Sequence, residues 1–256
     1  MSIHSSAVIE DGAQIGDGVE IGAYSVIGAN VKIGDGTRVH PHVVIDGVTT
    51  IGQKCEFFPF ACIGTQTQDL KFSGGETSVK IGDRTTLREY VTVNSGTNGG
   101  EQTIVGSDCH ILAYCHVAHA CRVGNGVIMS NGATLAGDVI VEDQAIIGGL
   151  SGIHQFTRIG RLCMVGGMTK ITKDCPSFMI VDGNPARVRG VNVIGLERKQ
   201  VDSASRDSIK KAYRLLYRDG LSTQQAIDEI KKSIEPCDEL SQLIAFVESS
   251  KRGILK

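Results

Sequence analysis

The sequence predicts an all-β fold, a parallel β-helix of hexapeptide repeats, followed by a small α-helical domain. Ile, Val, Leu, Met or Phe occupies every sixth position from Ile9 to Ile171, and the pattern is interrupted only at Asp69, Gly75 and Gly99. A period of six fits neither an amphipathic helix nor long strands and is typical of a solenoid of very short strands. The 32 glycines and the absence of Trp suit a coil with many tight turns and a narrow interior.

Each repeat pairs a branched apolar residue with a turn residue. In Gln14-Ile15-Gly16 and Glu20-Ile21-Gly22 the apolar residue precedes Gly, and a small or apolar residue stands two positions before it. Alternation along a short strand places those two apolar positions on one side. Three repeats per turn give a triangular coil of about 18 residues, in which strands of successive turns pair in parallel.

The repeat region is expected to span residues 1–191 and to be interrupted by two loops. Residues 65–80 and 95–102 are polar and rich in Gly, so they are predicted to leave the coil. Long loops on a rigid scaffold are common places for binding. Residues 175–190 are predicted to be an irregular exit from the coil.

Residues 192–256 are predicted to be helical. Apolar residues fall on one helical face between 209 and 216, and Asp219-Gly220 is a stop signal. Ser222 with Gln225 is a capping-box start for a second helix, and Pro236 separates it from a last apolar set. This part carries a small excess of basic residues, which suits an acidic partner.

The charge, hydropathy and cysteine content of the chain argue against several classes of protein. A net charge of −2 argues against a general nucleic-acid or membrane surface. No apolar run approaches the roughly 18 residues of a membrane helix and the N-terminus lacks a signal-peptide pattern, so we expect a cytoplasmic protein. The eight cysteines form no CxxC pair and are expected to be small buried residues in a reducing compartment.

The sharpest chemical signal is His116-Val117-Ala118-His119. Because Val117 is an inward ladder residue, His116 should point outward and His119 should lie at or near a corner. Adding 18 to 119 gives Gly137, and adding 18 again gives Gln155, so these three should stack at one corner.

This column predicts an acyl-transfer site. The His119 imidazole would remove a proton from an attacking hydroxyl, and the bare backbone N–H of Gly137 would stabilise the oxyanion on the carbonyl under attack. His154 lies beside the column and adds a polar contact. No nucleophile elbow surrounds a Ser and no Cys has an obvious base, so direct transfer is favoured over a covalent intermediate.

A metal site and a purely structural role are the rival interpretations. Trimeric coil proteins of the γ-carbonic-anhydrase type bind zinc through a pattern with two histidines five apart, whereas His110, His116 and His119 are six and three apart. We therefore expect neither a metal nor any other cofactor. A non-enzymatic solenoid would explain the ladder but not the column of His119, Gly137 and Gln155.

Several motifs carry a family resemblance that covers essentially the whole chain. They are Gln68-Asp69-Leu70-Lys71, His116-Val-Ala-His119, Leu135-Ala-Gly137, Ile153-His154-Gln155-Phe156, Met164-Val-Gly-Gly167, Gly190-Val-Asn192 and Gly195-Leu196. Together with the ladder they resemble the UDP-N-acetylglucosamine O-acyltransferases of lipid A biosynthesis. The resemblance implies a left-handed β-helix, a homotrimer with sites between subunits, and transfer of an R-3-hydroxyacyl group from acyl carrier protein to the 3-hydroxyl of UDP-GlcNAc.

The same resemblance assigns residues to roles. His119 would be the general base and Gly137 the oxyanion donor, while Gly167 would set the acyl-chain length and, as a glycine, leave room for a longer chain. Contacts with the nucleotide sugar or the acyl-pantetheine arm are implied for Gln68, Asp69, Lys71, His116, His154, Gln155, Asn192 and Arg198. Docking of the acidic carrier is implied for Arg198, Lys199, Lys210, Lys211, Arg214 and Arg218.

Some positions depart from the family pattern. Relatives commonly follow the catalytic His with Asp, but Ala120 stands here, so carboxylate support of His119 must come from elsewhere. Asp138 stands where some relatives have His, and Ile194 where an acidic nucleotide contact can occur. A 3-amino UDP-sugar acceptor, giving an amide, therefore stays open. The later lipid A N-acyltransferase is a further alternative, although it normally has an extra N-terminal domain, whereas the hexads here begin at Ile9.

Overall fold

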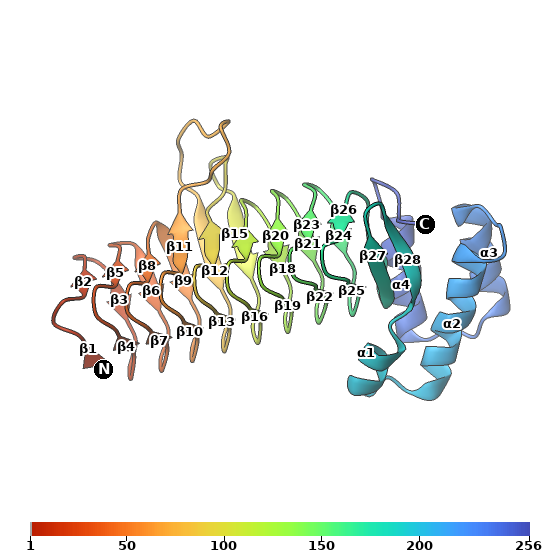
Figure 1. Cartoon of the computed structure of the whole chain (residues 1–256), viewed down its shortest axis with the longest axis horizontal. Helices are drawn as coiled ribbons and strands as arrows, with labels where there is room; N and C mark the ends of the chain where they lie inside the picture. Colours follow the sequence, from red (N-terminus) through yellow and green to blue (C-terminus); the bar gives the residue numbers. More distant parts are fainter. Residues whose placement is uncertain (1) are drawn as a thin grey trace.

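The computed structural model describes residues 2–256, which form a left-handed parallel β-helix and a C-terminal group of helices (Figure 1). Three sheets of 11, 9 and 8 strands, called sheets A, B and C, run along the coil. Most strands have only two residues, because each hexapeptide spends the rest of its length on a turn. The predicted fold class is confirmed.

Sheet A consists of β1 (Ser2–Ile3), β4 (Glu20–Ile21), β7 (Arg38–Val39), β10 (Glu56–Phe57), β13 (Thr86–Leu87), β16 (His110–Ile111), β19 (Ile128–Met129), β22 (Ile146–Ile147), β25 (Met164–Val165), β27 (Met179–Gly183) and β28 (Ala186–Val191). Sheet B consists of β2 (Val8–Ile9), β5 (Val26–Ile27), β8 (Val44–Ile45), β11 (Cys62–Thr65), β14 (Thr92–Asn94), β17 (His116–Val117), β20 (Thr134–Leu135), β23 (Gly152–Ile153) and β26 (Lys170–Ile171). Sheet C consists of β3 (Gln14–Ile15), β6 (Val31–Ile33), β9 (Val48–Ile51), β12 (Ser78–Ile81), β15 (Gln102–Val105), β18 (Arg122–Val123), β21 (Ile140–Val141) and β24 (Arg158–Ile159). The helices are α1 (Val193–Arg198), α2 (Ser203–Tyr217), α3 (Thr223–Ser233) and α4 (Asp238–Glu248).

The ladder residues fill the interior of the coil. Ile27, Val117 and Ile159 have no exposed surface, and the apolar residue two positions earlier in the repeat also points inward, as Cys115 does before Val117. In the first turn of the coil Ile9 is only partly buried, because no earlier turn covers it.

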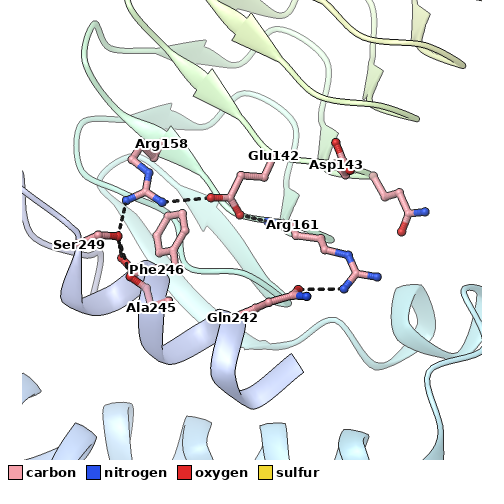
Figure 2. A pocket seen from close by; sticks show the side chains of 9 residues that line it. Glu142, Asp143, Arg158, Arg161, Gln242, Ala245, Phe246 and Ser249 are labelled. Atoms are coloured by element: carbon pink, nitrogen blue, oxygen red, sulfur yellow. Dashed lines mark hydrogen bonds and ion pairs between the residues drawn. The ribbon is translucent and has the colours of Figure 1, made fainter. Parts of the chain in front are cut away.

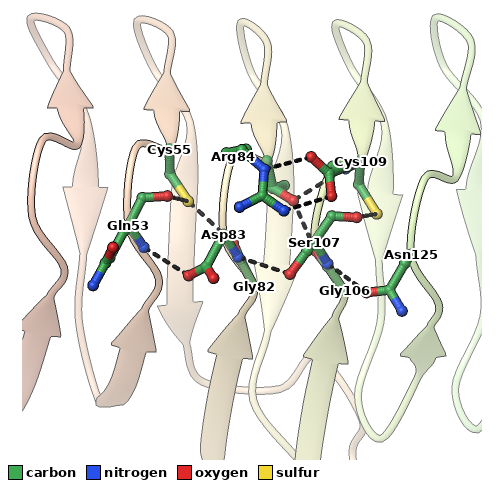
Figure 3. Close-up of polar contacts among 11 residues, drawn as sticks. Gln53, Cys55, Gly82, Asp83, Arg84, Gly106, Ser107, Cys109 and Asn125 are labelled. Carbon is green, nitrogen blue, oxygen red and sulfur yellow. Dashed lines mark hydrogen bonds and ion pairs between the residues drawn. The ribbon is translucent and has the colours of Figure 1, made fainter.

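Register along the coil follows the predicted step. In sheet B, His116 pairs with Thr134 and Thr134 pairs with Gly152, so these partners lie 18 residues apart. Polar side chains join successive turns at the corner between sheets C and A (Figure 3). The Asp83 carboxylate accepts from the backbone N–H of Gln53 at 2.9 Å, and the Ser107 hydroxyl accepts from that of Asp83 at 3.0 Å. These bonds satisfy turn N–H groups that have no strand partner.

The two loops leave the coil together, at the corner between sheets B and C (Figure 1). The first loop lies between the end of β11 at Thr65 and the start of β12 at Ser78. The second lies between the end of β14 at Asn94 and the start of β15 at Gln102. The first loop is therefore shorter than predicted. Residues 78–80 were wrongly included in that loop, because they pair with both β9 and β15. The Gly100 N–H donates to the Glu76 carbonyl at 2.8 Å and ties the two loops to each other.

The predicted irregular exit is wrong for most of its length. Strand β27 continues sheet A in parallel with β25, and β28 folds back antiparallel to β27. The hexapeptide pattern does not predict this hairpin of β27 and β28, because a hairpin that closes the coil has no period of six. β28 ends at Val191 and α1 begins at Val193.

Helices α2, α3 and α4 pack around an apolar core that also includes Leu162, Phe178 and Met179 from the end of the coil and Leu196 of α1. Ser222 and Gln225 form the predicted capping box at the start of α3. Helix α4 is fastened to the coil by Arg158, whose guanidinium donates to the Ser249 hydroxyl at 2.9 Å and to the Glu142 carboxylate at 3.0 Å (Figure 2). The same group lies 4.3 Å above the Phe246 ring. These contacts fix the helical domain relative to the last turns of the coil.

Candidate active site

His119 lies in the turn after β17, at the corner between sheets B and C. The backbone N–H of Asp138 donates to the His119 carbonyl at 3.0 Å, and that of Phe156 donates to the Gly137 carbonyl at 3.2 Å. The predicted column of His119, Gly137 and Gln155 is therefore present, one residue per turn of the coil.

Gly137 leaves the space that the imidazole occupies. A Cβ at this position would lie 2.1 Å from both Nε2 and Cε1 of His119, so any side chain here would displace the ring. Within residues 2–256 the Gly137 N–H donates no hydrogen bond to backbone or side chain. An imidazole and a backbone N–H without a partner among the described residues are thus adjacent at one corner.

Carboxylates approach both nitrogens of His119. Asp69 Oδ2 lies 3.6 Å from Nε2, and Asp138 Oδ2 lies 3.9 Å from Nδ1. The His119 side chain is only 17% exposed, and Nδ1 has no hydrogen-bond partner within the described residues. Burial raises the pKa of the Asp138 carboxyl above its usual value, and the charge of His119 offsets only part of this rise.

The two loops position Asp69. Its backbone N–H donates to the Thr67 hydroxyl at 3.1 Å, and its carboxylate accepts from the Lys71 N–H at 3.0 Å. Thr67 in turn shares a hydrogen bond of 3.1 Å with Thr97 of the second loop. A hydrogen bond from Asn98 lowers the pKa of the Glu101 carboxyl, which also binds the Thr97 and Asn98 N–H groups. The interruptions of the ladder therefore build one wall of the corner.

His116 lies on the outer face of sheet B beside this corner. Its Nδ1 is 2.7 Å from the Thr92 hydroxyl. Burial lowers its pKa, and the charge of His119 lowers it further. Because Thr92 bonds to one ring nitrogen of His116, the other nitrogen of the imidazole is available to a ligand. His154 and Gln155 are exposed at the same corner, one turn beyond Gly137.

A second candidate region lies on the outer face of sheet A. A groove of about 460 Å³, called the sheet A groove, is lined by Ile128, Ile146, Met164, Ile180, Asn192, Arg198 and Lys199, among others. The first four side chains form one outward column, because their residues pair strand to strand. Gly167 follows Met164 at the corner between sheets A and B and is exposed.

Within one chain these two regions do not meet. In a three-sided coil the corner between sheets B and C lies opposite sheet A, so His119 and the sheet A groove point away from each other. Asn192 lines the groove, but its side chain is buried and engaged: it accepts from the Gly195 N–H at 3.0 Å and donates to the Leu162 carbonyl at 2.9 Å. A role for its amide in substrate binding stays a prediction.

The basic residues predicted to dock a carrier are all exposed: Arg198, Lys199, Lys210, Lys211, Arg214 and Arg218. On α2, Lys210 pairs with Asp207 at 2.9 Å and Arg214 with Asp219 at 3.2 Å. Exposed pairs of this kind are worth less than about 1 kcal/mol, so they do not prevent contact with another acidic partner.

Two family models match the chain. The model described as Udp N-acetylglucosamine O-acyltransferase, Domain 2, covers residues 174–255, and the model for bacterial transferase hexapeptide repeats matches residues 12–47 and 102–137. An acyl-[acyl-carrier-protein]–UDP-N-acetylglucosamine O-acyltransferase of Thermodesulfovibrio yellowstonii is 48% identical over 255 residues, 99% of each chain.

The chain belongs to the acyl-[acyl-carrier-protein]–UDP-N-acetylglucosamine O-acyltransferase family. A second such acyltransferase, from Verminephrobacter eiseniae, is 45% identical and covers 100% of this chain and 99% of its own. Among solved structures, LpxA from Acinetobacter baumannii superimposes with a TM-score of 0.96 at 42% identity, and the UDP-N-acetylglucosamine acyltransferase of Bacteroides fragilis with 0.97 at 37%. Both structural alignments cover 99% of each chain.

Sequence reasoning missed two features of this family member. The Asp138 carboxylate was noted only as a departure, although adding 18 to Ala120 places it one turn beyond that residue at the same corner. The apolar floor of the sheet A groove was also missed, although Ile128, Ile146 and Met164 are themselves 18 apart and sit at outward positions. The signal was present in both cases, because the same step that stacks the interior also stacks the exterior.

Residues 2–256 contain no group of three or more His, Cys, Asp or Glu side chains arranged to hold a metal ion. None of the helices in this part of the chain is both long and apolar enough to span a bilayer.

Proposed function

We propose that this protein transfers an R-3-hydroxyacyl group from acyl carrier protein to the 3-hydroxyl of UDP-GlcNAc, the first step of lipid A biosynthesis. The observation that carries the proposal is the His119 imidazole lying flat against Gly137, with a carboxylate near each ring nitrogen. The family of the chain supplies the substrates, since its relatives are named for this reaction.

The chemistry follows from the corner. His119 Nε2 takes the proton of the sugar hydroxyl as that oxygen attacks the thioester carbonyl. The Gly137 N–H, free of other partners, donates to the oxyanion that forms. The imidazolium then returns the proton to the leaving thiolate of the carrier arm. Asp69, held on the Nε2 side by its loop, lies where it can contact the sugar.

The acyl chain is assigned to the sheet A groove of a neighbouring subunit. Ile128, Ile146 and Met164 give an apolar floor of the kind that an alkyl chain requires. Gly167 lies at the edge of this face, and the absence of a side chain there leaves room for a longer hydroxyacyl group.

The homotrimer in this proposal is supported by the placement of the two regions on opposite sides of one coil. A second copy is needed to bring a sheet A groove to the corner that holds His119 and Gly137. The carrier is assigned to the exposed basic residues of α1 and α2, from Arg198 to Arg218, because acyl carriers are acidic. All eight cysteines are unpaired, which supports the assignment to the reducing cytoplasm.

The first test replaces the base. His119→Ala is expected to lower kcat by about a thousandfold, within the range of general-base contributions, while Tm and oligomeric state stay unchanged. Acyl transfer is measured with UDP-GlcNAc and with its 3-amino analogue as acceptors. Near-normal turnover by the variant would overturn the mechanism, and a strong preference for the 3-amino sugar would redirect the proposal to amide formation.

The second test mixes two inactive variants. His119→Ala removes the base, and Ile146→Arg places a charge in the sheet A groove. Subunits of the two variants, unfolded and refolded together, are expected to regain activity that neither has alone, because some sites then combine an intact corner with an intact groove. No gain on mixing would place each complete site within one chain.

A further inference from the structure

His119 Nδ1 is buried and has no hydrogen-bond partner within residues 2–256. An unpaired buried donor or acceptor is destabilising, so such an atom in a folded protein calls for a functional reason. In a general base, the nitrogen opposite the reacting one is the atom that fixes the tautomer.

Four charged or titratable groups face the His119 ring from the elements packed around it. Asp69 and Glu101 come from the two loops, His116 from β17, and Asp138 from the turn after β20. Asp69 is on the Nε2 side, and both Glu101 oxygens bind Asn98. His116 carries no negative charge. Asp138 is therefore the carboxylate available to Nδ1.

Backbone hydrogen bonding within the coil fixes the position of Asp138 next to His119. Its N–H donates to the His119 carbonyl at 3.0 Å, and its φ of 59° matches the φ of 55° at Ala120, one turn earlier at the same corner. Ala120 itself offers no carboxylate. The step of 18 residues delivers a carboxylate to the same corner from the next turn instead.

We infer that Asp138 is the positioning residue of His119: it accepts the Nδ1–H, leaves the lone pair on Nε2, and stabilises the imidazolium that forms. This inference rests on the proposed function. The separation of 3.9 Å is longer than a hydrogen bond, and a small rotation of the Asp138 side chain, which is 37% exposed, brings the two atoms within range in the free protein. The proton passes from the sugar hydroxyl to Nε2 and then to the leaving thiolate, and Asp138 stays ionised throughout.

The test is Asp138→Asn, an isosteric change that removes the charge. We expect kcat to fall about a hundredfold with little change in KM, and the acidic limb of the kcat/KM profile to move to lower pH, because the imidazolium loses its carboxylate. Asp108→Asn is the matched control, since Asp108 has a φ of 57° at another corner and pairs with Arg84 instead. The control should keep full activity.

Two further measurements separate positioning from structure. Adding Ala120→Asp to Asp138→Asn should raise kcat at least tenfold above that of Asp138→Asn alone, because it returns a carboxylate to the same corner. Nitrogen-15 spectra of histidine-labelled protein should show the Nδ1–H tautomer of His119 in the parent and a mixture in Asp138→Asn, whether or not turnover is measured.

The outcomes distinguish this inference from the function on which it rests. If the parent transfers acyl groups and Asp138→Asn does so equally well with an unchanged pH profile, Asp138 has no positioning role. A rise in KM alone, or an unchanged His119 tautomer, overturns it equally. If the parent is inactive with every acceptor and carrier, the proposed function fails, and only the tautomer measurement then judges Asp138.

Discussion

Two corners of the same coil use an identical backbone step for opposite purposes. At the corner between sheets A and B, side chains stack on side chains: Tyr24, His42, Phe60, Tyr90 and Tyr114 form a continuous pile with ring centroids 4.9–5.2 Å apart. At the corner between sheets B and C, the His119 ring rests on Gly137, where no side chain exists. One corner is filled and the other is kept open.

The difference shows how a repeat acquires a site. All five stacked residues have φ values between 59° and 66°, a region that non-glycine residues rarely adopt. Stacking along the whole pile offsets this local strain. At the corner between sheets B and C, the glycine one turn beyond His119 leaves room for the imidazole to lie against bare backbone, with 17% of the His119 side chain exposed.

Closing the open corner should have the largest effect. Gly137→Ala places a Cβ 2.1 Å from the His119 ring, which must move away. We expect kcat/KM to fall at least a hundredfold with Tm nearly unchanged, measured by acyl transfer and thermal unfolding. Gly190→Ala is the control, since a Cβ there meets nothing within 4 Å. Full activity in Gly137→Ala would show that the open corner is not the reaction site.

The filled corner also continues past its aromatic pile to Gly167. A Cβ at Gly167 would meet only the Gly149 backbone, at 3.4 Å, so a side chain fits without disturbing the fold. Gly167→Met is expected to lower kcat/KM about tenfold for long hydroxyacyl carriers and to favour short ones, since a methylene discriminates by about 1–3 kcal/mol. Carriers of graded chain length measure this. An unchanged preference would remove Gly167 from the chain-length role.

Opening the filled corner should cost stability rather than activity. Tyr90 stacks on both Phe60 and Tyr114, whereas Tyr24 stacks only on His42. Tyr90→Ala is expected to lose about 1–2 kcal/mol of unfolding free energy and Tyr24→Ala about half as much, because each aromatic pair is worth about 0.5–1.5 kcal/mol. Denaturant unfolding gives both values. Equal losses of unfolding free energy in the two variants would mean that backbone strain, rather than ring stacking, determines the stability of this corner.

The smallest effect concerns the loops that frame the open corner. Hydrogen bonds from Asn98 and Thr97 lower the pKa of Glu101 below its unfolded value. The contribution of Glu101 to the stability of the two loops is therefore fully present above about pH 4.3, its unfolded pKa. It is lost as the pH falls through the lower pKa of the folded state. Protection of the Thr97 and Asn98 amides from hydrogen exchange, corrected for intrinsic rates, should fall over that window. Glu101→Gln should show no such dependence.

Much of this molecule could be predicted from its period. The positions of Ile9 to Ile171 indicated the coil, and the step of 18 residues by itself placed Gly137 over His119. The hairpin of β27 and β28 could not be predicted in this way, because it breaks the period that carried every other assignment. The same holds for Asn192, whose amide is taken up by Leu162 and Gly195 from different parts of the fold.

The sequence by itself determined the coil, the corner at which His119 stands and the family of the chain, since all three follow from residue types at fixed spacing. Only the tertiary structure decided which groups reach the imidazole. Asp69 arrives on a loop of no fixed period, and Asp138 turns toward Nδ1 from the next turn of the coil. Spacing along a chain fixes where a backbone lies, but contacts between side chains depend on distances of a few ångströms that only the packed structure sets.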